Sequence, residues 1–201
     1  MKISRTDNLA SVPAADWNAL EGGLDNPFVR HEFLAGLEAH RCLGKRWGWL
    51  PTHLLAHEGE RLVGAVPLYV KYNSYGEFVF DWSWADAYRR ANLPYYPKLV
   101  VSVPYTPAPG PRLLLADDAP EGTADALIEA TLELAREMEV SSLHWLFTGE
   151  RDTRILQRHH LMRRTGTQFH WFNQGYRDFN DFLEQFTAQK RKKLKRERRR
   201  V

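Results

Sequence analysis

The stretch "HLLAHEGERLVGAVPLYVK", residues 53–71, holds two apolar runs on either side of a short polar break. The runs "HLLAH" and "RLVGAVPLYVK" have the length and composition of β-strands, and "EGE" between them is typical of a tight turn. We therefore expect a β-hairpin here. Because a lone hairpin cannot bury an apolar face by itself, it must be part of a larger sheet.

Alternating elements surround this hairpin along the chain. Two short amphipathic segments precede it, and the apolar segments after it alternate with amphipathic ones. Helices are expected at residues 14–20, 30–40, 119–140 and 153–162, and from about Asp178 onward. Further strands are expected at residues 76–82, 98–103, 141–147 and 165–173. Antiparallel strands first, then alternating strands and helices, predict an α/β (α+β) fold with a mixed sheet.

The composition limits the class of protein. With 201 residues, of which 43% are hydrophobic, the chain suits one domain, or one domain plus a fragment. No apolar run approaches the roughly 18 residues of a membrane span, and residues 1–17 lack the apolar stretch of a signal peptide. We therefore expect no transmembrane segment and a cytoplasmic location. Cys42 is the only cysteine, which excludes an internal disulfide, and the histidine spacings do not suit zinc, so no metal is expected.

Basic residues are concentrated at one end of the sequence. The formal net charge is +3, yet residues 189–200, "QKRKKLKRERRR", hold nine Lys or Arg against Glu197 alone. This tail carries +8, and the remainder, with 19 basic and 24 acidic residues, carries −5. The apolar helical stripe before the tail ends at Phe186, so one helix from about Asp178 is expected to continue into it without support. The tail is either a solvated end or an unspecific contact for RNA, anionic lipid or an acidic protein surface.

The segment "VPYTPAPGPR", residues 103–112, follows an expected strand, where many α/β proteins place a phosphate-binding loop. Such loops present backbone N–H groups, and proline has none. Only Gly110 offers the conformational freedom that these loops use. The segment is therefore expected to be a rigid wall beyond a strand end, or a stiff connection between two strands. Four prolines interrupt it: Pro104, Pro107, Pro109 and Pro111.

The segment "EFVFDWSWADAYRR", residues 77–90, concentrates aromatic and charged side chains beyond another expected strand. Indoles stack on sugar rings or other flat groups, and a carboxylate can orient or deprotonate an attacking amine. Asp81 and Asp86 are the candidate catalytic residues. The alternative is structural, with the indoles filling the end of the core and the aspartates capping a short helix.

The candidate binding residues come from both segments and from the strand between them. Lys98, just before that strand, is a candidate phosphate contact, or else a solvated lysine. Five residues, Trp82, Trp84, Asp86, Tyr105 and Arg112, are expected to line one pocket at the carboxyl ends of neighbouring strands. The full candidate set for substrate binding is Trp82, Trp84, Tyr88, Lys98, Tyr105, Thr106, Gly110 and Arg112.

Long stretches of the chain resemble a bacterial family of FemAB-like proteins in the acyl-CoA N-acyltransferase (GNAT) superfamily. The resemblance is carried by "NPFVRHEFLAGLEAH", "GWLPTHLLAHEGERLVGAVPLYVKYNSYGEFVFDWSWADAYRRA", "YYPKLVVSVPYTPAPGPRLL" and "FTAQKRKKLKRERR". It covers essentially the whole chain, and the family is commonly described as concerned with peptidoglycan biosynthesis or recognition. It implies a GNAT-like, largely antiparallel sheet flanked by helices, followed by a basic linker helix.

The resemblance also implies two domains with different functions. Residues 1–177 would form an N-terminal GNAT-like domain, and residues 178–201 a basic helix leading into a second GNAT-like domain, the expected partner. The donor of the full-length protein would be acyl-CoA or aminoacyl-tRNA. The proline-rich segment departs from the glycine-rich turn that holds the CoA pyrophosphate in GNAT domains, so this half is expected to bind no donor and to contribute acceptor recognition.

Three functions are compatible with these features. The first is an acyl- or aminoacyl-transferase that modifies an amine acceptor, such as a peptidoglycan precursor. The second is a module that binds a cell-wall or amino-sugar ligand without turnover. The third is a protein that binds RNA phosphates through its basic tail. The family resemblance favours the first, and the other two are the alternatives.

Overall fold

The hairpin expected at residues 53–71 is present in the computed structural model, which describes residues 1–20 and 26–200. Strands β3 (His53–Glu58) and β4 (Arg61–Val66) pair antiparallel around Gly59, whose φ of 60° suits glycine. On either side, β1 (Lys2–Thr6) pairs with β3, and β7 (Leu114–Leu115) pairs with β4. The result is a four-stranded antiparallel sheet in the order β1-β3-β4-β7.

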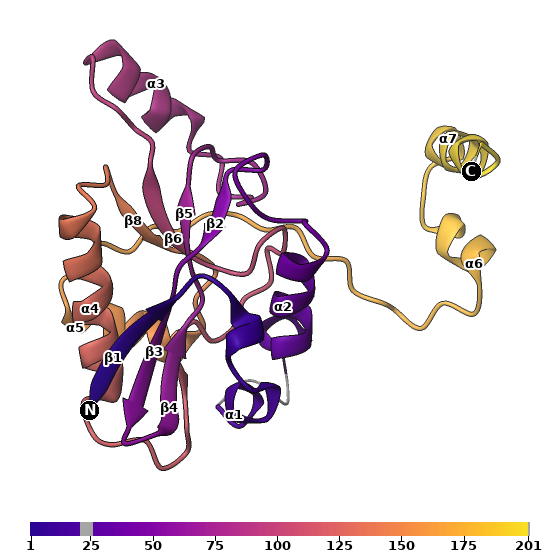
Figure 1. Cartoon of the computed structure of the whole chain (residues 1–201). Coiled ribbons are helices and arrows are strands. Elements are labelled where there is room, and N and C mark those ends of the chain that lie inside the picture. Colours follow the sequence, from indigo (N-terminus) through magenta and orange to yellow (C-terminus); the bar gives the residue numbers. More distant parts are fainter. Residues whose placement is uncertain (21–25, 201) are drawn as a thin grey trace. The chain divides into compact units, whose positions relative to one another are not determined.

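The two hairpin strands continue into a second sheet (Figure 1). Strand β2 (Trp49–Pro51) leads through Thr52 into β3, and β4 leads through Pro67 into β5 (Leu68–Lys71). Thr52 N donates to Leu68 O at 2.8 Å, so the two segments stay bonded where they change sheets. The second sheet has the order β2-β5-β6-β8. In it β6 (Lys98–Val101) is antiparallel to β5 and parallel to β8 (Leu143–Trp145).

Side chains of the hairpin alternate between two cores, because neighbouring residues of a strand point to opposite faces. Leu54 and Val63 belong to a core that includes Leu127 of α4 (Thr123–Glu137). Leu55 and Leu62 belong to a second core around Trp17, Val29 and Leu34. Both faces are buried, which explains why the runs are apolar almost throughout.

Helices cover the two faces of the first sheet, as Figure 1 shows. On one side lie α4 and α5 (Glu150–Arg158); on the other lie α1 (Ala14–Asn18) and α2 (His31–Ala39), with the short 3-10 helices η1 (Leu9–Ser11) and η2 (Pro27–Val29) beside them. Gly64 allows α4 to approach β4 closely, because a Cβ there would lie 3.0 Å from Leu127 Cδ1. The predicted α/β (α+β) class, with a mixed and largely antiparallel sheet arrangement flanked by helices, is confirmed.

The proline-rich segment runs beyond the carboxyl ends of the parallel pair β6 and β8. Gly110 N donates to Phe147 O at 3.0 Å, and Gly149 N donates to Gly110 O at 2.8 Å, so the segment extends the sheet. Asp152 of α5 accepts hydrogen bonds from the backbone N–H groups of Arg112 and Leu113, at 2.6 and 3.1 Å. These contacts agree with the stiff connection, the second interpretation of this segment.

The structure divides into two compact units, Met1–Arg163 and Arg164–Val201. In the second unit, Asp178 caps α6 (Phe179–Glu184) by accepting from the backbone N–H groups of Asn180 and Asp181. A separate helix, α7 (Ala188–Arg198), contains most of the basic tail. The boundary at residue 177 and the second GNAT-like domain stay predictions.

Three expected elements are wrong. Residues 76–81 form no strand, and Trp82–Arg90 is the helix α3. Phe78 has a φ of 58°, outside the extended region that a strand requires, although Glu77 and Asp81 do turn into the interior. Residues 165–173 form no regular secondary structure. The single helix expected from Asp178 is broken at residues 185–187 into α6 and α7, and Arg191 Nη1 of α7 donates to Glu184 O of α6 at 3.4 Å. The expectation that the distal turns are unsupported stays a prediction.

The buried Asp152 carboxylate provides a test of how the connection is held. Replacing Asp152 with Ala leaves two buried N–H groups without their acceptor, so we expect the free energy of unfolding to fall by about 2–4 kcal/mol in urea titrations. Glu150→Ala, at an exposed site in the first turn of the same helix, should change it by less than about 0.5 kcal/mol. Equal losses in the two variants would contradict this account.

Candidate functional site

A buried ammonium group lies at the start of β6. Lys98 has no exposed surface, and its Nζ donates to Glu77 Oε2 at 2.8 Å, to Ser74 Oγ at 3.2 Å and to Asp81 Oδ2. Two carboxylates therefore face one lysine in the interior, which is an arrangement that desolvation makes costly unless the geometry is good. We call Glu77, Asp81 and Lys98 the buried ionic cluster.

Two tyrosines separate this cluster from the surface. Tyr95 OH donates to Asp81 Oδ2 at 2.6 Å, and the Tyr96 hydroxyl lies 2.7 Å from Ser74 Oγ. The Lys98 ammonium lies 5.2 Å from the centroid of the Tyr95 ring and 5.8 Å from that of Tyr96. The tyrosines are thus fixed both by hydrogen bonds and by cation–π attraction.

The pKa values of the two carboxylates of the cluster are shifted in opposite directions. Burial raises the pKa of Glu77. Burial also acts to raise the pKa of Asp81, but hydrogen bonds to Lys98, Ser74 and Tyr95 outweigh it and lower that pKa. Glu77 is therefore the better proton acceptor, and Asp81 the group held ionised. Glu77 Oε1 and Asp81 Oδ1 have no hydrogen-bond partner among the described residues.

A second buried lysine adjoins the cluster. Lys71, the last residue of β5, lies with its ammonium 3.7 Å from the centroid of the Trp49 ring and donates to Tyr75 O at 3.1 Å. Burial lowers its pKa to about 7, and the charge of Lys98 acts in the same direction. A lysine with a pKa near neutrality can accept or donate a proton under ordinary conditions.

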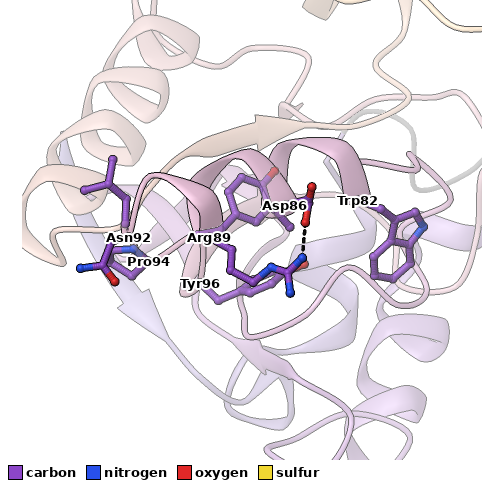
Figure 2. A pocket seen from close by; sticks show the side chains of 9 residues that line it. Trp82, Asp86, Arg89, Asn92, Pro94 and Tyr96 are labelled. Atoms are coloured by element: carbon purple, nitrogen blue, oxygen red, sulfur yellow. Dashed lines mark hydrogen bonds and ion pairs between the residues drawn. The ribbon is translucent and has the colours of Figure 1, made fainter.

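An open pocket of about 600 Å³ lies against α3 and the chain that follows it (Figure 2). Tyr95 and Tyr96 line it together with Trp82, Asp86 and Arg89. Figure 2 shows Asp86 and Arg89 paired on the helix. Ion pairs with Arg89 and Arg90 lower the pKa of Asp86, so this half-buried carboxylate is suited to holding a cation and is a weak base.

The structure brings together only part of the predicted pocket. Trp82 and Asp86 line it. Tyr88 does not, but its ring contacts that of the lining residue Tyr95, with centroids 5.1 Å apart. Trp84 lies on the same helix, is 52% exposed and does not line the pocket. The candidate Asp81 lies in the interior, at the residue before α3.

Other predicted binding residues lie apart from this pocket. Arg112 is fully buried, and its guanidinium donates to the carbonyls of Leu146, Pro111 and Ala108. Tyr105 OH donates to Cys42 O at 2.8 Å. The expectation of one pocket shared by Trp82, Trp84, Asp86, Tyr105 and Arg112 is thus wrong, because internal hydrogen bonds hold the last two elsewhere. Lys98 is not a solvated lysine either, since two carboxylates neutralise it.

Backbone donors of the proline-rich segment are also engaged. Tyr105 N donates to Gly76 O, Thr106 N to Val103 O and Gly110 N to Phe147 O. Arg112 N donates to Asp152. Of the six N–H groups in this segment, these four are used within the protein, so they are not free to bind a phosphate.

Sequence reasoning missed the residues that support the pocket: Ser74, Glu77, Tyr95, Tyr96 and Lys71. Lys71 is the last residue of the apolar strand β5, and Lys98 is the first residue of the apolar strand β6. A charged residue at such a position indicates a buried partner of opposite charge. No sequence signal identifies the carboxylates that pair with Lys98. Glu77 and Asp81 lie in a segment whose alternating aromatic residues predict a strand.

The chain matches a family described as FemAB-like, peptidoglycan biosynthesis/recognition, over residues 8–201. It belongs to the FemAB-like family. The resemblance seen in the sequence is confirmed. A search of curated proteins found no match.

Solved structures similar to this FemAB-like chain include acetyltransferases. Ribosomal-protein-alanine N-acetyltransferase from Brucella melitensis biovar Abortus 2308 has 16% identity and a TM-score of 0.47, with 86% of this chain and 100% of that chain covered. Aminoglycoside N-acetyltransferase AAC(6')-Iy, in complex with CoA, has 10% identity and a TM-score of 0.46, with 86% and 99% covered. The tetramutant of the BH1408 protein from Bacillus halodurans has 12% identity and a TM-score of 0.51, with 86% and 100% covered. At these identities the likeness concerns the fold alone.

Within the described residues, no group of three or more His, Cys, Asp or Glu side chains is placed to hold a metal ion. No helix in the described ranges combines the length and the apolar character needed to cross a membrane.

Lys71 predicts a pH dependence of stability. Its folded pKa of about 7 lies below the ordinary value of 10.5, so between these values the unfolded chain binds a proton that the folded chain lacks. The free energy of unfolding should therefore rise from about pH 7.5 to about pH 9, by up to about 1.4 kcal/mol per pH unit. Urea titrations across this range should show a steeper rise for the native chain than for Lys71→Met; parallel curves would refute the assignment.

Acetyl-CoA binding tests the account of the proline-rich segment. Because its N–H groups are engaged, we expect no binding of acetyl-CoA at micromolar concentration in calorimetry with this chain. Micromolar binding that is lost when residues 104–112 are changed would show that the segment holds the pyrophosphate after all.

Proposed function

We propose that this chain is the acceptor-recognition part of an N-acyltransferase and binds the amine-bearing acceptor, a peptidoglycan-precursor fragment, in the pocket beside α3. The observation that carries the proposal is the lining of that pocket in a member of a family described as peptidoglycan biosynthesis/recognition. Trp82, Tyr95 and Tyr96 supply flat apolar surfaces, and Asp86 and Arg89 supply opposite charges. A sugar bearing a short peptide offers the matching groups: flat ring faces, an amine and carboxylates.

The two charged side chains of the pocket bind different groups of the acceptor in this proposal. Asp86, held ionised by its arginines, binds and orients an ammonium, and Arg89 binds a carboxylate. An amine must be neutral to attack an acyl group, so a base has to take its proton. The raised pKa of Glu77 makes it a better proton acceptor than Asp81 or Asp86, but Glu77 is buried and does not line the pocket, so we assign no base within the pocket.

The donor comes from elsewhere in this proposal. Acyl-CoA is the donor we propose for the whole protein, and AAC(6')-Iy, a protein of similar fold, was solved with CoA. The engaged N–H groups of the proline-rich segment support a donor site outside this chain, in a second GNAT-like domain.

A pair of tryptophans on one helix tests the pocket. The probe is a soluble N-acetylmuramyl tripeptide ending in lysine, with binding measured by calorimetry. Trp82→Ala should weaken binding about tenfold, because truncating a buried aromatic contact costs more than about 1 kcal/mol. Trp84→Ala, which removes an indole of similar exposure outside the pocket, should leave binding unchanged. Equal losses, or none, would contradict the assignment of the pocket.

Binding without turnover is the second candidate, favoured by the engagement of four backbone N–H groups of the proline-rich segment in bonds within the protein. The two are separated in a protein that carries this chain together with the proposed second GNAT-like domain, by incubating it with acetyl-CoA and the tripeptide and looking for the acetylated product by mass spectrometry. A product whose formation falls in Trp82→Ala supports acceptor recognition for transfer. Tight tripeptide binding without product supports a recognition module.

A further inference from the structure

Helix α7 has two unlike sides. Arg191 Nη1 donates to Glu184 O at 3.4 Å, and the Arg198 guanidinium lies 4.1 Å from the centroid of the Phe179 ring. Both partners belong to α6. Arg191, the half-buried Leu194 and Arg198 follow the spacing of one helical face, which is therefore the face that packs within the unit.

The other side of α7 forms a basic hollow of about 830 Å³. Its residues recur at intervals of three and four along the helix, so they share a face. The only carboxylate in this stretch of sequence is Glu197, and Lys193 lies 3.8 Å from it. For the other cations of the hollow, no ion pair occurs within the described part of the chain. The lining consists of Gln189, Lys190, Lys192, Lys193, Arg196, Arg199 and Arg200.

Such a row of cations fits a polyanion better than a lipid bilayer. A helix that lies in a membrane interface needs an apolar face beside its basic one, and α7 offers only Leu194. At a rise of about 1.5 Å per residue, the hollow extends for about 16 Å along the helix, enough to contact several phosphates of an extended strand.

Aromatic rings in the same unit identify which polyanion. Trp171 is 63% exposed and stacks on Tyr176, with ring centroids 6.1 Å apart and planes inclined by 26°. Its ring also meets Phe182, which contacts Phe179, the ring that lies under Arg198 of α7. A continuous series of contacts thus joins an exposed indole to the basic helix. Basic rows beside exposed aromatic rings are typical of surfaces for single-stranded nucleic acid.

We propose that residues 164–200 bind single-stranded nucleic acid, with phosphates in the basic hollow of α7 and a base stacked on Trp171. Recognition is by phosphate charge and by stacking, so it is insensitive to base sequence. This site is independent of the pocket beside α3, and its residues belong to the other compact unit.

The first experiment compares two charge-matched double variants. The probe is a fluorescein-labelled 20-nucleotide oligouridine, titrated by anisotropy over a series of salt concentrations. Arg196→Gln with Arg199→Gln, in the hollow, should weaken binding about tenfold at about 0.1 M salt and reduce the salt slope by about 1.4. Arg191→Gln with Arg198→Gln removes the same charge from the packing face and should weaken binding less. Circular dichroism checks that α7 persists in both.

The second experiment tests stacking and excludes other anions. Trp171→Ala should weaken oligouridine binding about tenfold, Trp171→Phe should restore most of it, and Trp84→Ala should have no effect. Equal losses in the two arginine pairs, or no loss in Trp171→Ala, would overturn the proposal in favour of unspecific charge attraction. It would equally be overturned if vesicles of phosphatidylglycerol or poly-glutamate bound as tightly as oligouridine. Tripeptide binding measured in the same variants should be unchanged, which separates this proposal from the one for the pocket beside α3.

Discussion

A full positive charge buried at the start of a strand governs the arrangement of the proposed site. A buried ammonium is costly without anionic partners, and the chain supplies two for Lys98 from the segment just before α3. Neutralising the lysine therefore also fixes where Asp81 lies and where α3 begins. The same ammonium attracts the faces of Tyr95 and Tyr96, which form one wall of the pocket. The pairing of one buried lysine with two carboxylates thus fixes the position of Asp81, the start of α3 and the two tyrosines that line the pocket.

The parallel pair β6 and β8 shows why the pocket lies where it does. Ligands of open α/β sheets usually bind beyond the carboxyl ends of such strands. Here that position is filled by the proline-rich segment, which bonds to the continuation of β8 and buries Arg112 against three carbonyls. The surface left for a ligand is the flank of α3, where aromatic rings and opposite charges are both accessible.

The sequence was sufficient for the parts of the fold that depend on local pattern. The hairpin of β3 and β4 and the long helix α4 have strong periodic signals, and a turn residue separates the two strands. The pocket depends instead on contacts between distant positions, such as Lys98 with Glu77, and no local pattern reveals which carboxylate a buried lysine will meet. Residues 76–81 illustrate the difficulty, because their alternating aromatic residues have the period of a strand while their acidic residues are drawn inward by Lys98. The sequence predicts Arg112 as a ligand-binding residue because it does not reveal the three backbone carbonyls that bind its guanidinium.

Helix α3 contributes no buried side chain to the core, although the residue just before it, Asp81, is almost completely buried. The residue that fixes the start of the helix, Asp81, is therefore distinct from the residues that form its exposed surface. Residues 82–90 can diverge between related chains, or be exchanged by design, without disturbing the packing of the sheet, so long as Asp81 is kept. The helix is thus the natural place for members of this fold to acquire different ligand preferences at little cost in stability.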